Sequence, residues 1–265
     1  MNQSQLDDTL FSPYLFTGLN VVITGAGRGI GAAVATEFLA HGAHVFAHMG
    51  VSEKSAHAHT LSAPVGCENL TTAYADLSKE VEITALSKQI SDKFSKIDVL
   101  INNAGTMFGR VATVDMSSEH YSRVMDLNAR SVVLLTTSLL PLLKRSGSAS
   151  IINTTSISAT TGGSAGSSMY SASKAFVSTY TRSLARELAP DNIRVNAISP
   201  GTIDTDFHER YSSKEKLAAT AAAIPLGRLG TPQDCAPACL FLASSQLSGY
   251  ITGQVLEING GQLMG

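Results

Sequence analysis

The chain has 265 residues, a net charge of −2 and charged side chains at only 15 % of its positions. At roughly 150 residues per domain, this length fits one large domain or two small ones, with a core large enough to fold without disulfides or metals. The near-zero net charge excludes strong nonspecific attraction to nucleic acid or to an anionic membrane. The three cysteines are scattered, the start is polar, and the most apolar stretch, 132–143, is too short to span a bilayer. We therefore expect a cytoplasmic protein without nucleic-acid or membrane partners.

Short apolar runs alternate with helical patterns along the chain. After an irregular leader at 1–17, the predicted strands are 20–24, 43–48, 70–75, 97–101, 149–154, 193–198 and 254–258. The predicted helices are 29–40, 78–94, 117–143, 169–188 and 231–242, with Ser78 and Thr231 as candidate N-caps. This alternation indicates repeated βαβ units, and the near-continuous apolar strands indicate a parallel sheet covered on both faces. Because no linker divides the chain, we predict one doubly wound α/β domain over 18–265, with about seven strands.

The first predicted strand ends in a glycine-rich turn that opens the first helix. The turn reads Thr24-Gly-Ala-Gly-Arg-Gly-Ile-Gly31, and its glycines would let the backbone approach a pyrophosphate at a helix N-terminus. The spacing between Gly25 and Gly29 departs from the usual dinucleotide fingerprint, so a plain packing turn is the alternative. The turn is not a P-loop, because no Lys-Ser or Lys-Thr pair follows the last glycine.

Tyr170 and Lys174 lie one helical turn apart at the start of a predicted helix. A lysine ammonium near a phenol favours the phenolate, so we expect Lys174 to lower the pKa of Tyr170 and let it exchange a proton with an alcohol or a carbonyl. By itself the pair is more often an ordinary surface pair on an amphipathic helix. Here it stands with Asp76-Leu77, Asn102-Asn-Ala-Gly105, Leu127-Asn-Ala129, Ser156 and Pro200-Gly-Thr-Ile-Asp-Thr205, each after a predicted strand or inside a helix.

This ordered set resembles the short-chain dehydrogenase/reductase family over about residues 18–261. The resemblance implies a Rossmann-type fold with Tyr170 as general acid/base, Lys174 as its activator and a ribose ligand, Ser156 polarising the substrate carbonyl, and Asn128 holding a relay water. It further implies a nicotinamide dinucleotide held by Gly25, Arg28, Gly29, Ile30, Gly31, Asp76, Leu77, Asn103, Ala104, Gly105, Tyr170, Lys174, Pro200, Gly201, Ile203 and Thr205. Within that set, Asp76 would accept a hydrogen bond from the adenine amine, and Ile203 and Thr205 would hold the carboxamide.

The end of the second predicted strand bears on which nicotinamide cofactor is used. NAD-binding chains place a carboxylate there to bind the ribose 2′-hydroxyl, and this chain has Met49 at about that position. In family members that use NADP, the residue at the position of Arg28 points toward the 2′-phosphate. His48, Ser52 and Lys54 are further candidates for a contact with that phosphate. We therefore favour NADP over NAD.

The substrate should lie beyond the carboxyl ends of the strands, among the predicted loops 106–113, 157–169 and 204–216. The candidate contacts are Met107, Arg110, Ser158 and Phe207, and Ser158 is also the nearest rival of Ser156. Arg110 or Arg210 could pair with a substrate carboxylate, or be solvated loop charges. The small polar residues of the second loop favour a compact polar ketone, and the same composition suits a 3-oxoacyl thioester.

The leading interpretation is thus an NADPH-dependent reductase of a small polar ketone or a 3-oxoacyl thioester. The alternatives are an NAD-dependent sugar or alcohol dehydrogenase and, in a different class, a non-catalytic cofactor-sensing protein on the same fold. Excess apolar residues on the 117–143 helix, at positions that pair across subunits in the family, indicate a homotetramer.

Overall fold

A computed structural model describes residues 14–53, 61 and 68–264 of the chain. Most of the predicted leader, the candidate phosphate ligand Lys54, the histidines at 57 and 59, and the cysteine at 67 lie outside the described residues. No helix in the described part is both long and apolar enough to cross a membrane.

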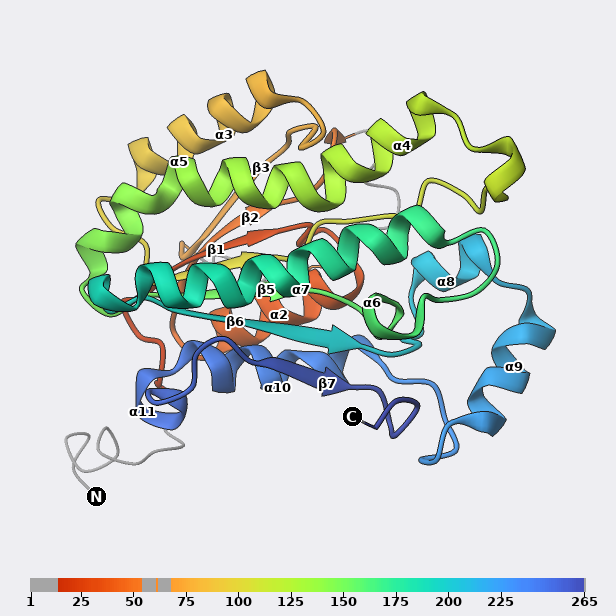
Figure 1. The fold of residues 1–265 in the computed structure, drawn as a ribbon. Coiled ribbons are helices and arrows are strands. Elements are labelled where there is room, and N and C mark those ends of the chain that lie inside the picture. The colour runs from red at the N-terminus through yellow and green to blue at the C-terminus, as the bar shows by residue number, and fades with distance from the viewer. Residues whose placement is uncertain (1–13, 54–60, 62–67, 265) are drawn as a thin grey trace.

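One seven-stranded sheet forms the centre of the molecule (Figure 1). Its strands are β1 (Asn20–Thr24), β2 (His44–His48), β3 (Leu70–Ala73), β4 (Val99–Asn102), β5 (Ser150–Thr154), β6 (Arg194–Pro200) and β7 (Val255–Ile258). They lie in the order β3-β2-β1-β4-β5-β6-β7, and every pair is parallel. The order reverses between β1 and β4, where doubly wound sheets open a crevice at their carboxyl edge. The predicted Rossmann-type α/β fold is confirmed.

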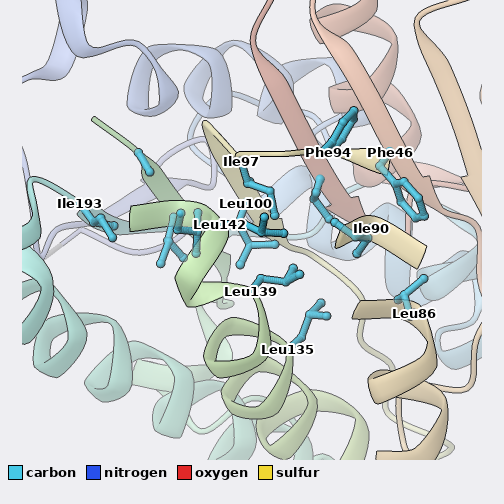
Figure 2. Close-up of a cluster of buried hydrophobic side chains, with 14 of the residues drawn as sticks. Phe46, Leu86, Ile90, Phe94, Ile97, Leu100, Leu135, Leu139, Leu142 and Ile193 are labelled. Carbon is cyan, nitrogen blue, oxygen red and sulfur yellow. The ribbon is translucent and has the colours of Figure 1, made fainter. Parts of the chain in front are cut away.

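Helices cover both faces of the sheet. Two helices, α2 (Gly29–Ala40) and α10 (Pro232–Ala243), pack against each other on one face. The other face carries α3 (Glu80–Lys93), α5 (Ser131–Ser146) and α7 (Ser168–Leu188). Figure 2 shows part of the core on this face, to which α3 contributes Leu86 and Ile90, α5 contributes Leu135 and Leu139, and β2 contributes Phe46. Burial of these two apolar layers is the main force holding the sheet between its helices.

The predicted 117–143 helix is interrupted once. It consists of α4 (Ser118–Met125), a π-helical turn (Asp126–Arg130) and α5, so Asn128 lies on the wider turn rather than on regular helix. Such single π turns often occur at functional sites. Pro141 inside α5 does not end the helix, which continues to Ser146.

Two predicted N-caps fare differently. The Thr231 cap is confirmed: Thr231 and Asp234 form a capping box with Pro232 at the first helical position. The Ser78 cap is wrong, because α3 begins two residues later with Lys79 as its N-cap residue. The Ser78 hydroxyl instead donates to Asp76 Oδ1 at 2.6 Å, closing a turn at the end of β3.

Two of the predicted substrate loops contain helices. Residues 157–169 include α6 (Ser158–Thr161), and residues 204–216 include α8 (Asp206–Tyr211) and the start of α9 (Lys214–Ala223). These short helices stand at the carboxyl end of the sheet, at the right of Figure 1. The prediction that these segments are loops is therefore partly wrong. At α9 the reason is a cap, because the Ser213 hydroxyl accepts a hydrogen bond from the Lys216 N–H. A further short helix, α11 (Ser245–Ser248), precedes β7.

Candidate active site

A cavity of about 930 Å³ opens at the carboxyl ends of the strands. It extends from the end of β2, past the glycine turn, to the short helices α6, α8 and α9. Ser52 does not line it; of the other predicted site residues within the described part of the chain, all do except Gly31 and Asn128. Those two lie directly behind its wall, and each has a different role there.

The glycine turn needs its glycines for two separate reasons. Gly25 and Gly29 have φ angles of +66° and +55°, which side chains other than glycine rarely adopt. A Cβ on Gly31 would stand 2.2 Å from the carbonyl oxygen of Gly25 and 2.5 Å from the side-chain nitrogen Nδ2 of Asn103. Gly31 thus lets α2 pack closely on the turn, whereas Gly25 and Gly29 shape the open side that faces the cavity.

Asn103 and Thr24 hold the turn against β4. The Asn103 side-chain amide donates to the carbonyl oxygens of Thr24 and Gly25, at 3.0 and 3.2 Å. The Thr24 hydroxyl accepts from the backbone N–H groups of Asn103 and Ala104, at 2.9 and 3.0 Å. These bonds make Asn103 a support of the turn as well as part of the cavity wall, a role that the sequence did not reveal.

His48, at the end of β2, does not serve as a phosphate ligand. Its side chain is buried, its Nδ1 accepts a hydrogen bond from the backbone N–H of Gly25 at 3.1 Å, and its Nε2 lies 2.9 Å from the carbonyl oxygen of Ala75. These partners require the neutral ring with its proton on Nε2. Burial lowers the pKa of His48 below its ordinary value of 6.5, although hydrogen bonds and the Asp76 carboxylate oppose that shift. His48 therefore fastens the glycine turn to the segment after β3, and the earlier prediction of a phosphate contact is wrong.

This fastening makes the stability of the protein pH-dependent. The pKa of His48 is lower in the folded protein than in the unfolded chain, where it is about 6.5. As the pH falls below 6.5, His48 therefore binds a proton more readily in the unfolded chain than in the folded protein. Protonation of His48 then favours unfolding. We expect the free energy of unfolding to fall by up to about 1.4 kcal/mol per pH unit more in the wild type than in His48→Asn. Urea unfolding of both proteins at about pH 7 and about pH 5 measures the difference. Equal pH slopes in the two proteins would contradict this role.

The polar pair Tyr170 and Ser156 lines the cavity. Tyr170 is on the first turn of α7 and shares a hydrogen bond with the Ser156 side chain, which follows β5. Ser158 donates to the same Ser156 oxygen from its hydroxyl at 3.1 Å and from its backbone N–H at 3.2 Å. Ser158 thus orients Ser156, and Ser156 is the serine in contact with the phenol.

Lys174 lies one turn further along α7, with its Nζ 5.8 Å from the centroid of the Tyr170 ring. The lysine is buried and donates to the carbonyl oxygen of Thr154 at 2.8 Å. Burial lowers the pKa of Lys174 to about 8 and raises the pKa of Tyr170 to about 12. The predicted lowering of the Tyr170 pKa is therefore wrong for this structure, because loss of solvation outweighs the bond with Ser156. At neutral pH Tyr170 is a phenol that can donate a proton, and Lys174 is mostly charged.

Two buried polar atoms behind this pair have no hydrogen-bond partner among the described residues: Asn128 Oδ1 and Thr154 Oγ1. The Asn128 amide donates to the carbonyl oxygens of Thr106 and Val124, both at 2.8 Å, which leaves its oxygen turned toward Gly105. A Cβ on Gly105 would stand 2.5 Å from that oxygen and 3.1 Å from Lys174 Nζ. Leaving buried acceptors unpaired is costly, so this region has the polarity to hold a water molecule or a ligand hydroxyl.

The two ends of the cavity differ in how their polar groups are engaged. At the β3 end, the Asp76 carboxylate accepts from Ser78 and lies 3.3 Å from Lys79 Nζ, which together lower its pKa against the opposing effect of burial. Leu77 is buried beside it. At the β6 end, Pro200, Gly201, Ile203 and Thr205 line the wall, and the Thr205 methyl would lie 3.3 Å from a Cβ on Gly29.

The predicted substrate residues surround the outer part of the cavity. Met107 is buried in its wall, and the Phe207 ring lies 5.5 Å from the Tyr170 ring. Arg110 is not a freely solvated charge: it donates to Tyr211 O at 3.0 Å, Ser164 Oγ at 2.9 Å and Ala165 O at 3.1 Å. Arg110 therefore joins the first, second and third substrate segments.

Some contacts of the cavity residues could not have been found by motif. Arg123 lies 4.6 Å above the Phe108 ring, and Lys216 reaches the cavity from α9. Arg28 forms an ion pair with Asp206 at 3.3 Å, which links the glycine turn to α8. All three interactions join segments far apart in the chain, so no local pattern announces them.

Comparisons with known proteins show which family and which relatives this chain is similar to. A family model described as "Enoyl-(Acyl carrier protein) reductase" matches residues 25–262. The chain is 39 % identical to the 3-oxoacyl-(acyl-carrier-protein) reductase FabG of Chlamydia muridarum, over 91 % of this chain and 95 % of that protein.

Solved structures agree with the sequence comparisons. An NADH-dependent reductase A1-R′ responsible for alginate metabolism superposes with a TM-score of 0.81 at 37 % identity, covering 94 % of this chain and 99 % of the other. The RhlG/NADP active-site complex of Pseudomonas aeruginosa superposes with a TM-score of 0.84 at 32 % identity, covering 94 % and 98 %. Similar chains thus include both an NADH-dependent protein and an NADP complex.

Proposed function

Because the chain belongs to the short-chain dehydrogenase/reductase family and is an NAD(P)-dependent oxidoreductase acting on carbonyl and alcohol groups, we propose a more specific activity for it. We propose that it is an NADPH-dependent reductase of a small polar ketone or a 3-oxoacyl thioester. The observation that carries the proposal is the Tyr170–Ser156 contact in the cavity, with Lys174 one turn away. Neither the NAD-dependent sugar or alcohol dehydrogenase nor the cofactor-sensing protein is favoured by these findings.

The cavity has the features that a dinucleotide requires. Gly25, Gly29 and Gly105 line the cavity with bare backbone, and a Cβ on Gly25 or Gly105 would collide with the neighbouring wall at 2.9 or 2.5 Å. The N-terminus of α2 offers backbone N–H groups to phosphate oxygens. Asn128 Oδ1 and Thr154 Oγ1 supply buried acceptor atoms near Lys174. Leu77, Asn103, Ala104, Ile203 and Thr205 complete the proposed cofactor wall. When bound, the nicotinamide exchanges a hydride with the substrate carbon.

Side chains of the protein supply the proton that the substrate carbonyl oxygen receives. Ser156 is placed to donate a hydrogen bond to the substrate carbonyl oxygen, which draws charge toward that oxygen. Tyr170, protonated at neutral pH, is placed to donate its phenolic proton to the same oxygen. The Lys174 ammonium stabilises the phenolate that remains, because it lies one turn away in a buried site. We propose that Asn128 holds a water that returns the proton.

Lys174 is assigned two tasks, which a variant can separate from simple loss of structure. Lys174→Ala should lower kcat and also weaken the cofactor by about tenfold, equivalent to about 1.4 kcal/mol. Kinetics and cofactor titration measure the two effects, with Lys144→Ala on the surface of α5 as the control. Unchanged cofactor affinity in a folded Lys174→Ala protein would remove the ribose role.

We propose NADP over NAD because of the residues at the end of β2. Met49 lines the cavity where a carboxylate would otherwise bind the 2′-hydroxyl and repel a 2′-phosphate. With His48 engaged elsewhere, Arg28 is the remaining candidate cation at this end that lies within the described residues. Its side chain is 43 % exposed and therefore accessible to a phosphate.

A screen with both cofactors tests the proposed reaction. Oxidation of NADPH and NADH is followed with oxo acids, keto sugars and 3-oxo thioesters. The proposal expects turnover with at least one carbonyl class and faster turnover with NADPH. Binding of the cofactor without turnover of any carbonyl would favour a cofactor-sensing protein instead.

We also propose a homotetramer in the cytoplasm. Phe176 on α7 is 42 % exposed and stacks on Tyr180 at 5.8 Å, which presents an aromatic surface suited to a second copy of the chain. Cys235 and Cys239 are free and buried, consistent with a reducing compartment. Light scattering of the purified chain measures the assembled mass.

A further inference from the structure

Two cations from distant segments meet on one hydroxyl group in the cavity. Arg110 Nη1 and Lys216 Nζ both donate to Ser164 Oγ, at 2.9 and 3.3 Å. Their charged nitrogen atoms therefore lie within two hydrogen-bond lengths of each other. Arg110 follows β4, Ser164 precedes α7 and Lys216 is on α9, so the fold brings the two like charges together.

No carboxylate among the side chains that the structure describes is paired with these charges. The described acids that line the cavity are Asp76 and Asp206, and their ion pairs are with Lys79 and Arg28. Among the side chains that the structure describes, which exclude those of residues 208 and 209, Arg110 and Lys216 form no ion pair, and neither do two further cations of the cavity, Arg123 and Arg210. Like charges held close together repel, and the resulting positive potential attracts an anion.

Both groups keep donors free for such an anion. The bonds of Arg110 use Nε and Nη1, which leaves the two N–H groups of Nη2 without a protein partner among the described residues. Lys216 uses its ammonium once, on Ser164. A carboxylate or phosphate accepts several such charge-assisted hydrogen bonds at once.

The cation pair is linked to the reacting centre through an aromatic bridge. Arg110 holds the carbonyl of Tyr211, the Tyr211 ring lies 5.1 Å from Phe207, and Phe207 lies 5.5 Å from Tyr170. The Tyr211 hydroxyl also lies 3.0 Å from Thr106 Oγ1, which fixes the bridge against the wall beside Asn128. A substrate with its carbonyl at Tyr170 and its chain along Phe207 would extend toward Arg110 and Lys216.

We propose that the substrate carries a negatively charged oxygen group that binds between Arg110 and Lys216. The proposal rests on the proposed function only for the position of the carbonyl, and it narrows the substrate to an anionic oxo compound. The anion has two possible sources: the carboxylate of a free oxo acid, or a phosphate of the carrier in a thioester. Recognition of the charge selects against neutral ketones of the same shape.

Two matched pairs of compounds separate these sources. 6-Oxoheptanoate, whose chain is long enough to pass along Phe207, is compared with its methyl ester, and acetoacetyl-CoA with the neutral N-acetylcysteamine thioester of the same acyl group. Binding of each compound to the full-length chain is measured by calorimetry, with and without NADP⁺, so that the result does not depend on turnover. The variant is Lys216→Gln, because Arg110 also holds the loops in place, and the control is Lys214→Gln on the same helix, outside the cavity wall.

We expect at least one anionic compound to bind about tenfold or more tighter than its neutral partner. Lys216→Gln should remove most of that difference and leave the neutral compound unaffected, and Lys214→Gln should change neither. A preference for 6-oxoheptanoate over its ester assigns the carboxylate, and a preference confined to acetoacetyl-CoA assigns the phosphate. Equal binding within both pairs, or equal losses for charged and neutral compounds in Lys216→Gln, would overturn the proposal. Separately, an anion preference without turnover of any of the four compounds with NADPH or NADH would count against the proposed reaction while the anion site stands.

Discussion

Tyr170→Phe should lower kcat by at least about 100-fold while leaving cofactor affinity nearly unchanged. The substitution removes only the phenolic oxygen, so the ring keeps its contact with Phe207 and its place on the first turn of α7. Without that oxygen, Ser156 can still polarise the carbonyl, but no side chain at this position can donate the proton. Steady-state kinetics with the best carbonyl from the screen, together with cofactor titration, measures both quantities.

Ser158→Ala is a matched control for this variant. Ser158 contacts Ser156 at 3.1 Å but not the phenol, so its loss should affect the rate far less than loss of the Tyr170 hydroxyl. Near-wild-type turnover by Tyr170→Phe would remove Tyr170 as the proton donor. A rate in Ser158→Ala as low as that of Tyr170→Phe would show that orientation of Ser156 limits the reaction.

Arg28→Ala should lower kcat/KM for NADPH by a factor of about 10 to 150 and change that for NADH little. This range corresponds to one charge-assisted hydrogen bond of roughly 1.5–3 kcal/mol. The structure adds a complication, because Arg28 also pairs with Asp206 at 3.3 Å. Asp206→Asn is therefore the control: it removes the ion pair but keeps the guanidinium, and should leave the NADPH preference intact. Exposed pairs contribute little to stability, so neither variant should unfold the protein.

The reverse substitution, Met49→Asp, should shift the preference toward NADH. A carboxylate at the end of β2 would bind the ribose 2′-hydroxyl and repel a 2′-phosphate. Kinetics with both cofactors on the three variants and the wild type decides the assignment. If the wild type prefers NADH and Arg28→Ala affects both cofactors equally, Arg28 is an ordinary turn residue.

The architecture was predictable because each element carries its own signal. The β-branched runs at Asn20–Thr24 and Ser150–Thr154 and the capping box at Thr231 are local patterns, and they fix where strands and helices form. The parallel direction of the strands then follows from alternation, since most consecutive strands are separated by a helix that can serve as the crossover. The position of Tyr170 beside Lys174 is likewise local, because it depends only on helical spacing.

The roles that depend on distant partners were not predictable. His48 looks like a basic residue near a phosphate, but its partners, the Gly25 N–H and the Ala75 carbonyl, are 23 and 27 residues away. The pKa of Tyr170 was expected to fall, and burial, which no spacing rule reports, raises it. Lys216 meets Arg110 only because α9 folds over the cavity, so the cation pair is a property of the tertiary structure.

Isotopic labelling tests most directly whether a hydride passes from the nicotinamide to the substrate carbon. NADPH deuterated at the transferred position of nicotinamide C4 is incubated with the protein and the best carbonyl from the screen, and the alcohol is analysed by mass spectrometry and NMR. We expect one deuterium on the carbinol carbon, and about a hundredth as much labelled alcohol or less when Tyr170→Phe replaces the wild type over the same short time. An alcohol formed by the wild type without deuterium on that carbon would contradict hydride transfer from the nicotinamide.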